Sequence, residues 1–325
     1  MPAMPVMPVK DENEYEDLLA AWSDLESGLG IILGSPESTQ QFAHRVLQYD
    51  RWMQALMQRD PDAGLYLLFQ LASNSPVGYS ASHSLVCGVL CHLIAREMKL
   101  PAKERDSLVH AALTMNVSMT AMQDVLANQS DRPSVQQQEM IRVHPVKSAM
   151  LLGNLGVRDE DWLEIVGSHH DNRVDAGDFG TIAPAVRLTR TLKMVDRYAA
   201  MISPRLSRAG RSATESARTV MATSSAKSDE IGHALMRVVG LCPPGTFVRM
   251  DSDELGVVLR RSAKANLPYV AIVGTADGQL LPAPRLHATA QGAPLIRAAL
   301  PASGVRAQLN HYQILGLGQR ASSGL

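Results

Sequence analysis

The stretch SASHSLVCGVLCHLIAREM, residues 80–98, decides the fold class. It is apolar around most of its circumference, and Lys99-Leu100-Pro101 ends it. A helix that is apolar on most sides must be covered on most sides by other elements. We therefore expect one long apolar helix here, packed in the core of a helical domain.

The sequence on both sides of this segment shows the spacing of amphipathic helices. Before it, the pattern predicts helices over residues 12–27 and 41–58 and from residue 65, with Gly28-Leu29-Gly30 as a break. After it, helices are expected over residues 103–114, 134–155, 159–170, 185–202, 212–222 and 228–239. His144-Pro145 is expected to interrupt the second of these six, because proline lacks a backbone donor.

The pattern changes at Leu241. Residues 246–250, 256–260 and 269–273 are typical of short strands, Asp277-Gly278 favours a hairpin turn, and a loose tail is expected from Gly318. We predict a mainly α chain in three parts: an N-terminal helical segment over 1–76, a helical domain over 77–240, and a β-rich C-terminal region with a loose tail over 241–325.

Composition argues against several classes of protein. The chain has 325 residues, 46% of them hydrophobic and 19% charged, with a formal net charge of -1. This balance favours no nucleic-acid or membrane partner. Residues 1–9 lack the features of a signal peptide, and no apolar run approaches the ~20 residues of a membrane span, so a cytoplasmic location is expected.

Cysteine usage argues against a secreted disulfide-bonded protein, because three cysteines at irregular spacing do not form a disulfide framework. Cys87 and Cys91 lie four residues apart on the central apolar segment. They could share a metal ion, but packing in the core is the simpler interpretation.

Five residues are candidates for metal binding. The chain has ten histidines, and four of them fall near the ends of predicted helices, whereas Asp196 lies within an apolar helix. The five candidates are His83, His144, His169, His170 and Asp196. Imidazoles and a carboxylate from several helices commonly hold divalent metals, and a buried carboxylate needs a partner.

Residues 79–245 resemble the HD-GYP family, the branch of the HD phosphohydrolases that hydrolyses cyclic di-GMP. The motifs follow the family's order: His83-Ser84, Ala111-Ala112-Leu113, Val143-His144-Pro145, His169-His170, Val195-Asp196-Arg197-Tyr198, Ser203-Pro204-Arg205 with Arg208, and Pro244-Gly245. The resemblance implies an HD-type helical bundle, a divalent metal (Fe, Mn or Zn) on the five candidates, and ligand binding by Arg205, Arg208 and Phe179.

The departures from the family are equally specific. Met115-Asn116 stand where the family has its metal-bridging His-Asp pair, and Met119 replaces a lysine. Tyr79 lies where the family can supply a glutamate, and residues 178–180 read Asp-Phe-Gly instead of Gly-Tyr-Pro. An asparagine offers one neutral oxygen and cannot bridge two cations, and a thioether suits softer metals.

We therefore expect no pair of bridged metals and assign no residue a catalytic role. One ion on His144, His169 and His170 is the hypothesis, and neutral hydrogen-bonded histidines without a metal are the alternative. The sequence indicates a degenerate HD-GYP-like signalling protein that binds a partner protein or cyclic di-GMP without efficient hydrolysis. The alternatives are a metal-dependent phosphodiesterase with a rearranged site and an HDOD-like scaffold. The N-terminal helices are candidates for a partner or homodimer surface.

Overall fold

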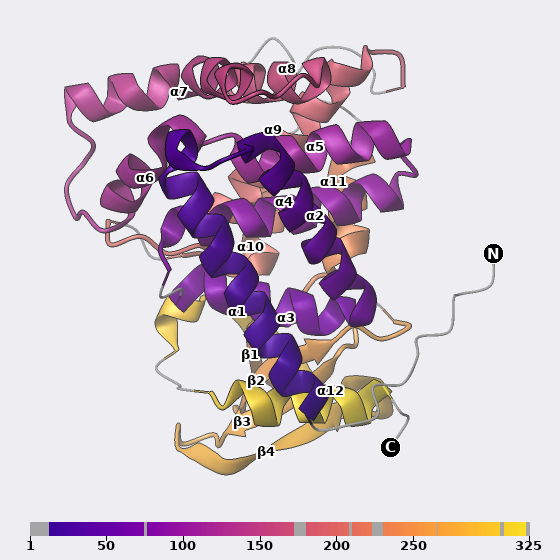
Figure 1. The fold of residues 1–325 in the computed structure, drawn as a ribbon. Helices are drawn as coiled ribbons and strands as arrows, with labels where there is room; N and C mark the ends of the chain where they lie inside the picture. The colour runs from indigo at the N-terminus through magenta and orange to yellow at the C-terminus, as the bar shows by residue number, and fades with distance from the viewer. Residues whose placement is uncertain are drawn as a thin grey trace.

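The computed structural model describes residues 13–74, 77–171, 180–207, 210–222, 230–264, 266–305 and 309–322. A helical bundle occupies most of this part of the chain, and a small sheet lies at its C-terminal end (Figure 1). This confirms the predicted fold class, a mainly α chain with a small β region. None of the helices in these ranges is both long enough and apolar enough to cross a membrane.

Among the described residues, three α-helices precede the central segment, eight form the bundle from α4 to α11, and a last one follows the sheet. The first three are α1 (Asn13–Gly34), α2 (Phe42–Arg59) and α3 (Pro61–Asn74). The bundle continues with α4 (Tyr79–Glu97), α5 (Ala102–Thr114), α6 (Thr120–Ala127), α7 (Val135–Asn154), α8 (Glu160–Ser168), α9 (Pro184–Ile202), α10 (Ala213–Ala222) and α11 (Glu230–Val239).

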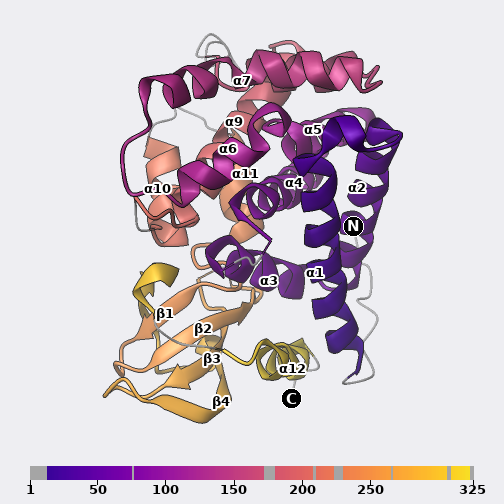
Figure 2. The same ribbon diagram turned by 60° about the vertical axis from the view of Figure 1, so that its left-hand side comes forward.

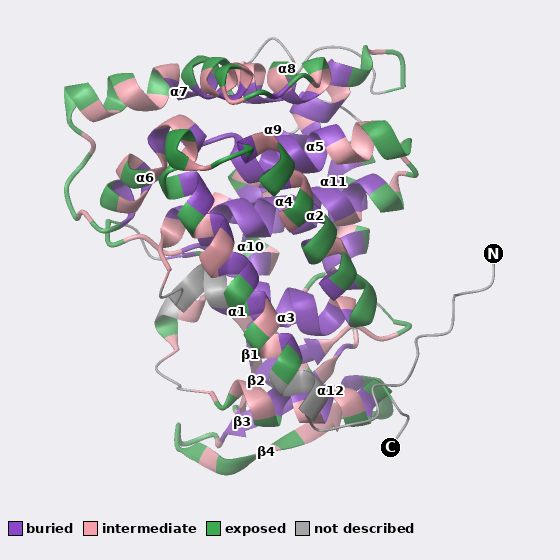
Figure 3. Cartoon of the chain, in the orientation of Figure 1, coloured by how far each residue is buried: buried purple, intermediate pink, exposed green. Residues whose placement is uncertain are grey.

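Helix α4 (Tyr79–Glu97) confirms the long apolar helix expected from the sequence, and it lies at the centre of the bundle. Nearly all of its residues are buried, and it packs against α1, α3, α5, α9 and α11 (Figure 3). Helices α7 and α8 form an outer layer at the top of Figure 1, with α8 packed on α5 and α9. The first turn of α4 therefore lies inside the protein.

The predicted break at Gly28-Leu29-Gly30 was wrong, because α1 continues to Gly34. Both glycines serve close packing instead. A Cβ atom at Gly28 would lie 2.8 Å from the Tyr49 ring, and one at Gly30 would lie 2.7 Å from a Val77 methyl group. The interruption expected at His144-Pro145 was also wrong, since α7 runs through Pro145 without a break.

The C-terminal sheet has five antiparallel strands in the order β4-β3-β2-β1-β5. The expected strands are β1 (Phe247–Met250), β2 (Leu255–Arg260) and β3 (Tyr269–Gly274), and two more follow, β4 (Leu280–Ala288) and β5 (Ile296–Leu300). The predicted turn lies between β3 and β4, and its Gly278 has a φ of 88°. The predicted loose tail was wrong, because α12 (His311–Ser322) includes Gly318 and buries Ile314 and Leu317.

Polar contacts fix the sheet to the N-terminal helices. Arg260 Nη1 lies 2.6 Å from Asp60 Oδ2, and Arg261 Nε lies 2.6 Å from Asp62 Oδ1, at the start of α3. Helix α12 lies between the sheet and α1 (Figure 2). These contacts hold the sheet at the end of the bundle that lies opposite α7 and α8. The division at residues 76 and 240 stays a prediction.

Candidate metal centre

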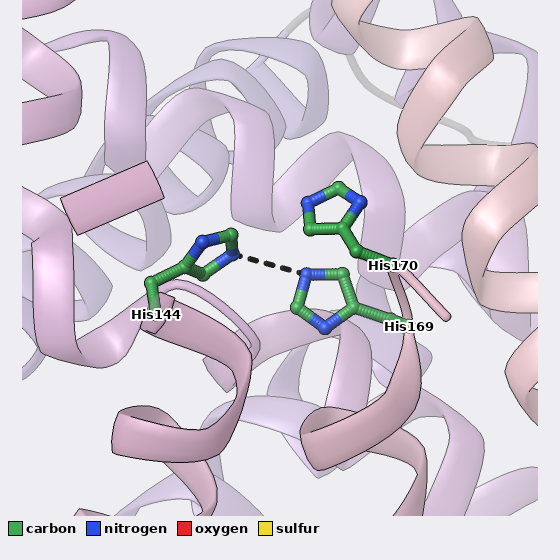
Figure 4. A group of neighbouring side chains, drawn as sticks. All are labelled: His144, His169 and His170. Atoms are coloured by element: carbon green, nitrogen blue, oxygen red, sulfur yellow. Dashed lines mark hydrogen bonds between the residues drawn. The ribbon is translucent and has the colours of Figure 1, made fainter. Parts of the chain in front are cut away.

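Three histidines meet between α7 and the end of α8 (Figure 4). His144 comes from the middle of α7, and His169 and His170 directly follow α8. One ring nitrogen from each lies within 4.8 Å of the others. His144 and His169 are buried, whereas His170 is exposed. We call this group the histidine trio.

The proline that follows His144 explains how that ring is oriented. Pro145 has no N–H, so it leaves free the carbonyl of Ile141, four residues earlier in α7. The Nδ1 atom of His144 lies 2.6 Å from this carbonyl oxygen and donates to it. The family's His-Pro motif therefore has a local cause: the proline releases the acceptor that fixes the histidine.

The end of α8 orients His169 in the same way. The last carbonyls of a helix have no intrahelical partner, and His169 Nδ1 donates to the carbonyl of Val166 at 2.7 Å. With both Nδ1 atoms protonated, the Nε2 atoms of His144 and His169 carry lone pairs. They face each other at 3.1 Å, along the dashed line of Figure 4.

The lone pairs on the two facing Nε2 atoms repel each other unless a cation lies between them. A shared proton is disfavoured, because burial lowers the pKa of His144 to about 4 and the pKa of His169 to about 3. Both rings are therefore neutral near pH 7, which is the form that ligates metals. A histidine that donates Nδ1–H to a carbonyl and offers Nε2 is the usual arrangement at a metal. The residues present fit a divalent ion.

A second group lies where α4 faces α9. His83 Nε2 is 2.8 Å from Asp196 Oδ1, and Cys87 Sγ is 3.6 Å from the same nitrogen. Burial raises the pKa of Asp196, but the hydrogen bond and charge of His83, with the charges of His169 and His170, lower it more. The net pKa lies below its usual range, so Asp196 is a carboxylate near pH 7.

The two groups bring together all five residues that the sequence singled out. The charges of His169 and His170 act on Asp196, which places the trio beside the second group. The sequence did not identify Cys87 as a member of this cluster. The signal was the four-residue spacing from His83, which puts both side chains on one face of a helix.

The altered family positions lie at the end of α5 and in the turn that follows it, and this turn packs against α7. Met115 is fully buried in the main hydrophobic core, and Asn116 is 8% exposed. The following turn is tied to α7, because Ser118 Oγ donates to the His144 carbonyl at 3.2 Å. Met119, which replaces the family's lysine, is 8% exposed. This segment offers the centre an amide and no charge.

Arg205 follows α9 and contacts the first residue of α4. Its guanidinium lies 4.7 Å from the centre of the Tyr79 ring, and Nη2 donates to the Tyr79 hydroxyl at 2.8 Å. The Tyr79 ring is also stacked on His83. The buried Nε atom of Arg205 has no hydrogen-bond partner among the described residues. Two other predicted ligand-binding residues, Arg208 and Phe179, lie outside the described residues.

A helical bundle that gathers histidines and one aspartate from four helical segments, in groups that could hold a metal ion, is the arrangement of an HD-type domain. The family model of the HD domain matches residues 67–230, just over half of the chain, and the chain belongs to this family. This confirms the family resemblance that the sequence motifs carried.

A cyclic di-GMP phosphodiesterase of Pseudomonas aeruginosa is 28% identical to this chain over 231 residues. The match covers 68% of this chain and 54% of that protein, so the chain spans about half the length of its curated relative. No solved structure matches the chain.

Proposed function

We propose that this chain is a degenerate HD-GYP-type signalling protein that binds cyclic di-GMP without efficient hydrolysis. The observation that carries the proposal is the pair Met115 and Asn116. The first is fully buried in the core and the second is neutral, so neither supplies the charge that bridges two metals. Phosphodiester hydrolysis by this family depends on paired metals, which activate a water and clamp the phosphoryl charge.

The ion that this proposal assigns to the histidine trio is a single divalent Fe, Mn or Zn. When bound, it would supply a positive charge that attracts phosphate oxygens. His144 and His169 would hold it through Nε2, and the exposed His170 would complete the set from the solvent side. The carbonyls of Ile141 and Val166 would keep both buried rings in place.

Arg205 is the proposed phosphate contact, because guanidinium groups grip phosphate through paired hydrogen bonds. Its Nη2 already donates to Tyr79, which leaves the buried Nε without a partner among the described residues. An anionic ligand would satisfy that donor. The relative's printed activity makes a cyclic dinucleotide the first ligand to test. A protein partner is the alternative ligand.

A metal-dependent phosphodiesterase with a rearranged site is the second candidate function. It is favoured by the retained contact between His83 and Asp196 at 2.8 Å beside the histidine trio. An HDOD-like scaffold is the third, and it predicts no nucleotide binding at all.

Binding and turnover of cyclic di-GMP should be measured together on protein purified without an affinity tag and loaded with manganese or iron. We expect saturable binding, no linear product, and at least ~10-fold weaker binding in Arg205→Ala, the loss of a charge-assisted contact. Arg237→Ala, which removes an exposed arginine paired with Glu97, is the matched control and should bind normally. Efficient turnover would establish the phosphodiesterase, and an absence of binding would leave the scaffold.

A further inference from the structure

We propose that Cys87, His83 and Asp196 form a zinc site in which the Cys87 thiolate is a ligand. Their donor atoms all lie within 4.8 Å of one another. The site lies beside the histidine trio and shares no residue with it. The proposal does not depend on cyclic di-GMP binding, because the thiolate ligand would be present with or without that nucleotide.

The sequence places these donors by two simple rules. His83 and Cys87 are four residues apart on α4, so their side chains lie on one face of that helix. Helix α9 packs against α4 and presents Asp196 to the same face. All three donors therefore come from two packed helices, which gives the site a rigid frame.

The distances suit a tetrahedral zinc ion. With Zn–S bonds of about 2.3 Å and Zn–N bonds of about 2.0 Å, tetrahedral angles separate sulfur from nitrogen by about 3.5 Å. The observed distance from Cys87 Sγ to His83 Nε2 is 3.6 Å. Nitrogen and oxygen ligands of zinc lie about 3.3 Å apart by the same geometry. His83 Nε2 and Asp196 Oδ1, now 2.8 Å apart through a hydrogen bond, need to separate only slightly.

The charges of this group balance a divalent ion. A thiolate and a carboxylate carry two negative charges, and a neutral imidazole adds none. On binding, Zn²⁺ would displace the Cys87 thiol proton to solvent, and His83 would bind through Nε2 as a neutral imidazole with its ring proton on Nδ1. The zinc site is then neutral, so it needs no bridging carboxylate at Asn116 and repels an ion at the trio only weakly.

The thiolate also selects the metal. Magnesium and manganese prefer oxygen ligands, whereas thiolate, imidazole and carboxylate together are typical of zinc. Without a metal, burial raises the pKa of the Cys87 thiol well above its usual value, so the free thiol is unreactive. Cys87 thus gains a chemical role only when a cation is present.

Cys91 provides a matched control, because it lies one turn further along α4 and is equally buried. Its sulfur does not belong to the metal-binding group that includes Cys87. Cys87→Ser and Cys91→Ser make the same chemical change on the same helix, so a loss of packing affects both variants alike.

The test is cobalt substitution of the full chain, purified without an affinity tag and freed of metal. Cobalt bound by a thiolate shows a sulfur-to-metal charge-transfer band in the near ultraviolet. We expect this band in the wild type and in Cys91→Ser, and we expect its loss in Cys87→Ser. Zinc content after dialysis should fall by about one ion per chain in Cys87→Ser alone, since one three-donor site is removed.

Three outcomes would overturn the proposal: no thiolate band in wild-type protein that has bound cobalt, a band retained in Cys87→Ser, or equal loss in both variants. X-ray absorption at the zinc edge of the wild type gives a test that needs no variant. Sulfur scattering at about 2.3 Å supports the site, and a shell of nitrogen and oxygen alone refutes it. His144→Ala should leave the band unchanged, which separates this site from the trio.

Discussion

Replacing Pro145 by alanine should stabilise α7 and at the same time weaken metal binding by the trio. The new N–H would donate to the carbonyl of Ile141, which His144 Nδ1 now uses at 2.6 Å. The ring would lose the contact that fixes its orientation and leaves Nε2 free for a metal. One substitution therefore affects stability and metal affinity in opposite directions.

The sizes of the expected changes in stability and in metal affinity can be estimated separately. A proline inside a helix costs ~3 kcal/mol relative to alanine, but buried Pro145 also loses about two methylenes worth ~0.8 kcal/mol each. The net gain in the free energy of unfolding is roughly 1 kcal/mol. Loss of a hydrogen-bond partner of a ligating histidine weakens metal affinity by roughly 10–100-fold.

Chelator competition gives the metal affinity, and urea unfolding of the metal-free protein gives the stability. Both are measured in a Cys87→Ser background, so that the trio alone contributes to binding. Val146→Ala is the control, because Val146 is the next residue along α7 and is 58% exposed. Metal affinity within about twofold of the parent would refute the role given to the freed carbonyl, since the expected loss is at least ~10-fold.

Three further predictions concern other parts of the molecule. Burial lowers the pKa of His92 to about 4. As pH falls, His92 therefore becomes protonated in the unfolded chain before it does in the folded protein, which favours unfolding. Up to about 3 kcal/mol of the free energy of unfolding should be lost between about pH 6.5 and about pH 4. Urea unfolding at both ends of that range should show a smaller difference in His92→Leu, and an equal difference would contradict the assignment. Asp60→Ala removes the nearer of the two carboxylates that contact the buried Arg260 and should cost about 3 kcal/mol in the same assay. Asp253→Ala, which breaks an exposed pair, should cost only about 0–1 kcal/mol, and equal costs would be the contrary result. Met115→His combined with Asn116→Asp should raise the metal content, as measured by elemental analysis. An unchanged metal content would mean that other residues of the site have also lost the ability to bind metal.

The long apolar helix over residues 80–98 and the amphipathic helices on both sides of it could be predicted from the sequence, because the pattern of apolar residues over many positions reports burial. Glycines predicted the ends of helices less well. Gly28 and Gly30 suggest a break when read alone, yet both allow another side chain to approach α1 closely. A glycine that ends a helix and one that permits close packing look the same in sequence, because the difference lies in a distant partner.

The five metal-binding candidates could be predicted because the resemblance fixes their order along the chain. The contacts that surround these candidates could be predicted only in part. The hydrogen bond of Tyr79 to Arg205 joins residues far apart in sequence, and no periodicity reports such a pair. The contact of Cys87 with His83 was within reach, since a four-residue spacing on a helix already predicts proximity.

The two ligand groups suggest how an HD centre can keep metal positions and still lose its reaction. A bridging carboxylate offsets the repulsion between two cations and holds them at a fixed separation, and Asn116 does neither. With a metal bound as proposed, the group around Cys87 would neutralise its ion with a thiolate and a carboxylate, whereas three neutral imidazoles would leave the ion of the trio positively charged. That charge remains available to an anionic ligand, with Arg205 as the proposed second contact. Without the bridge, nothing among the described residues fixes both ions around one water. Under the proposed function, such a centre would hold a phosphate without cleaving it efficiently.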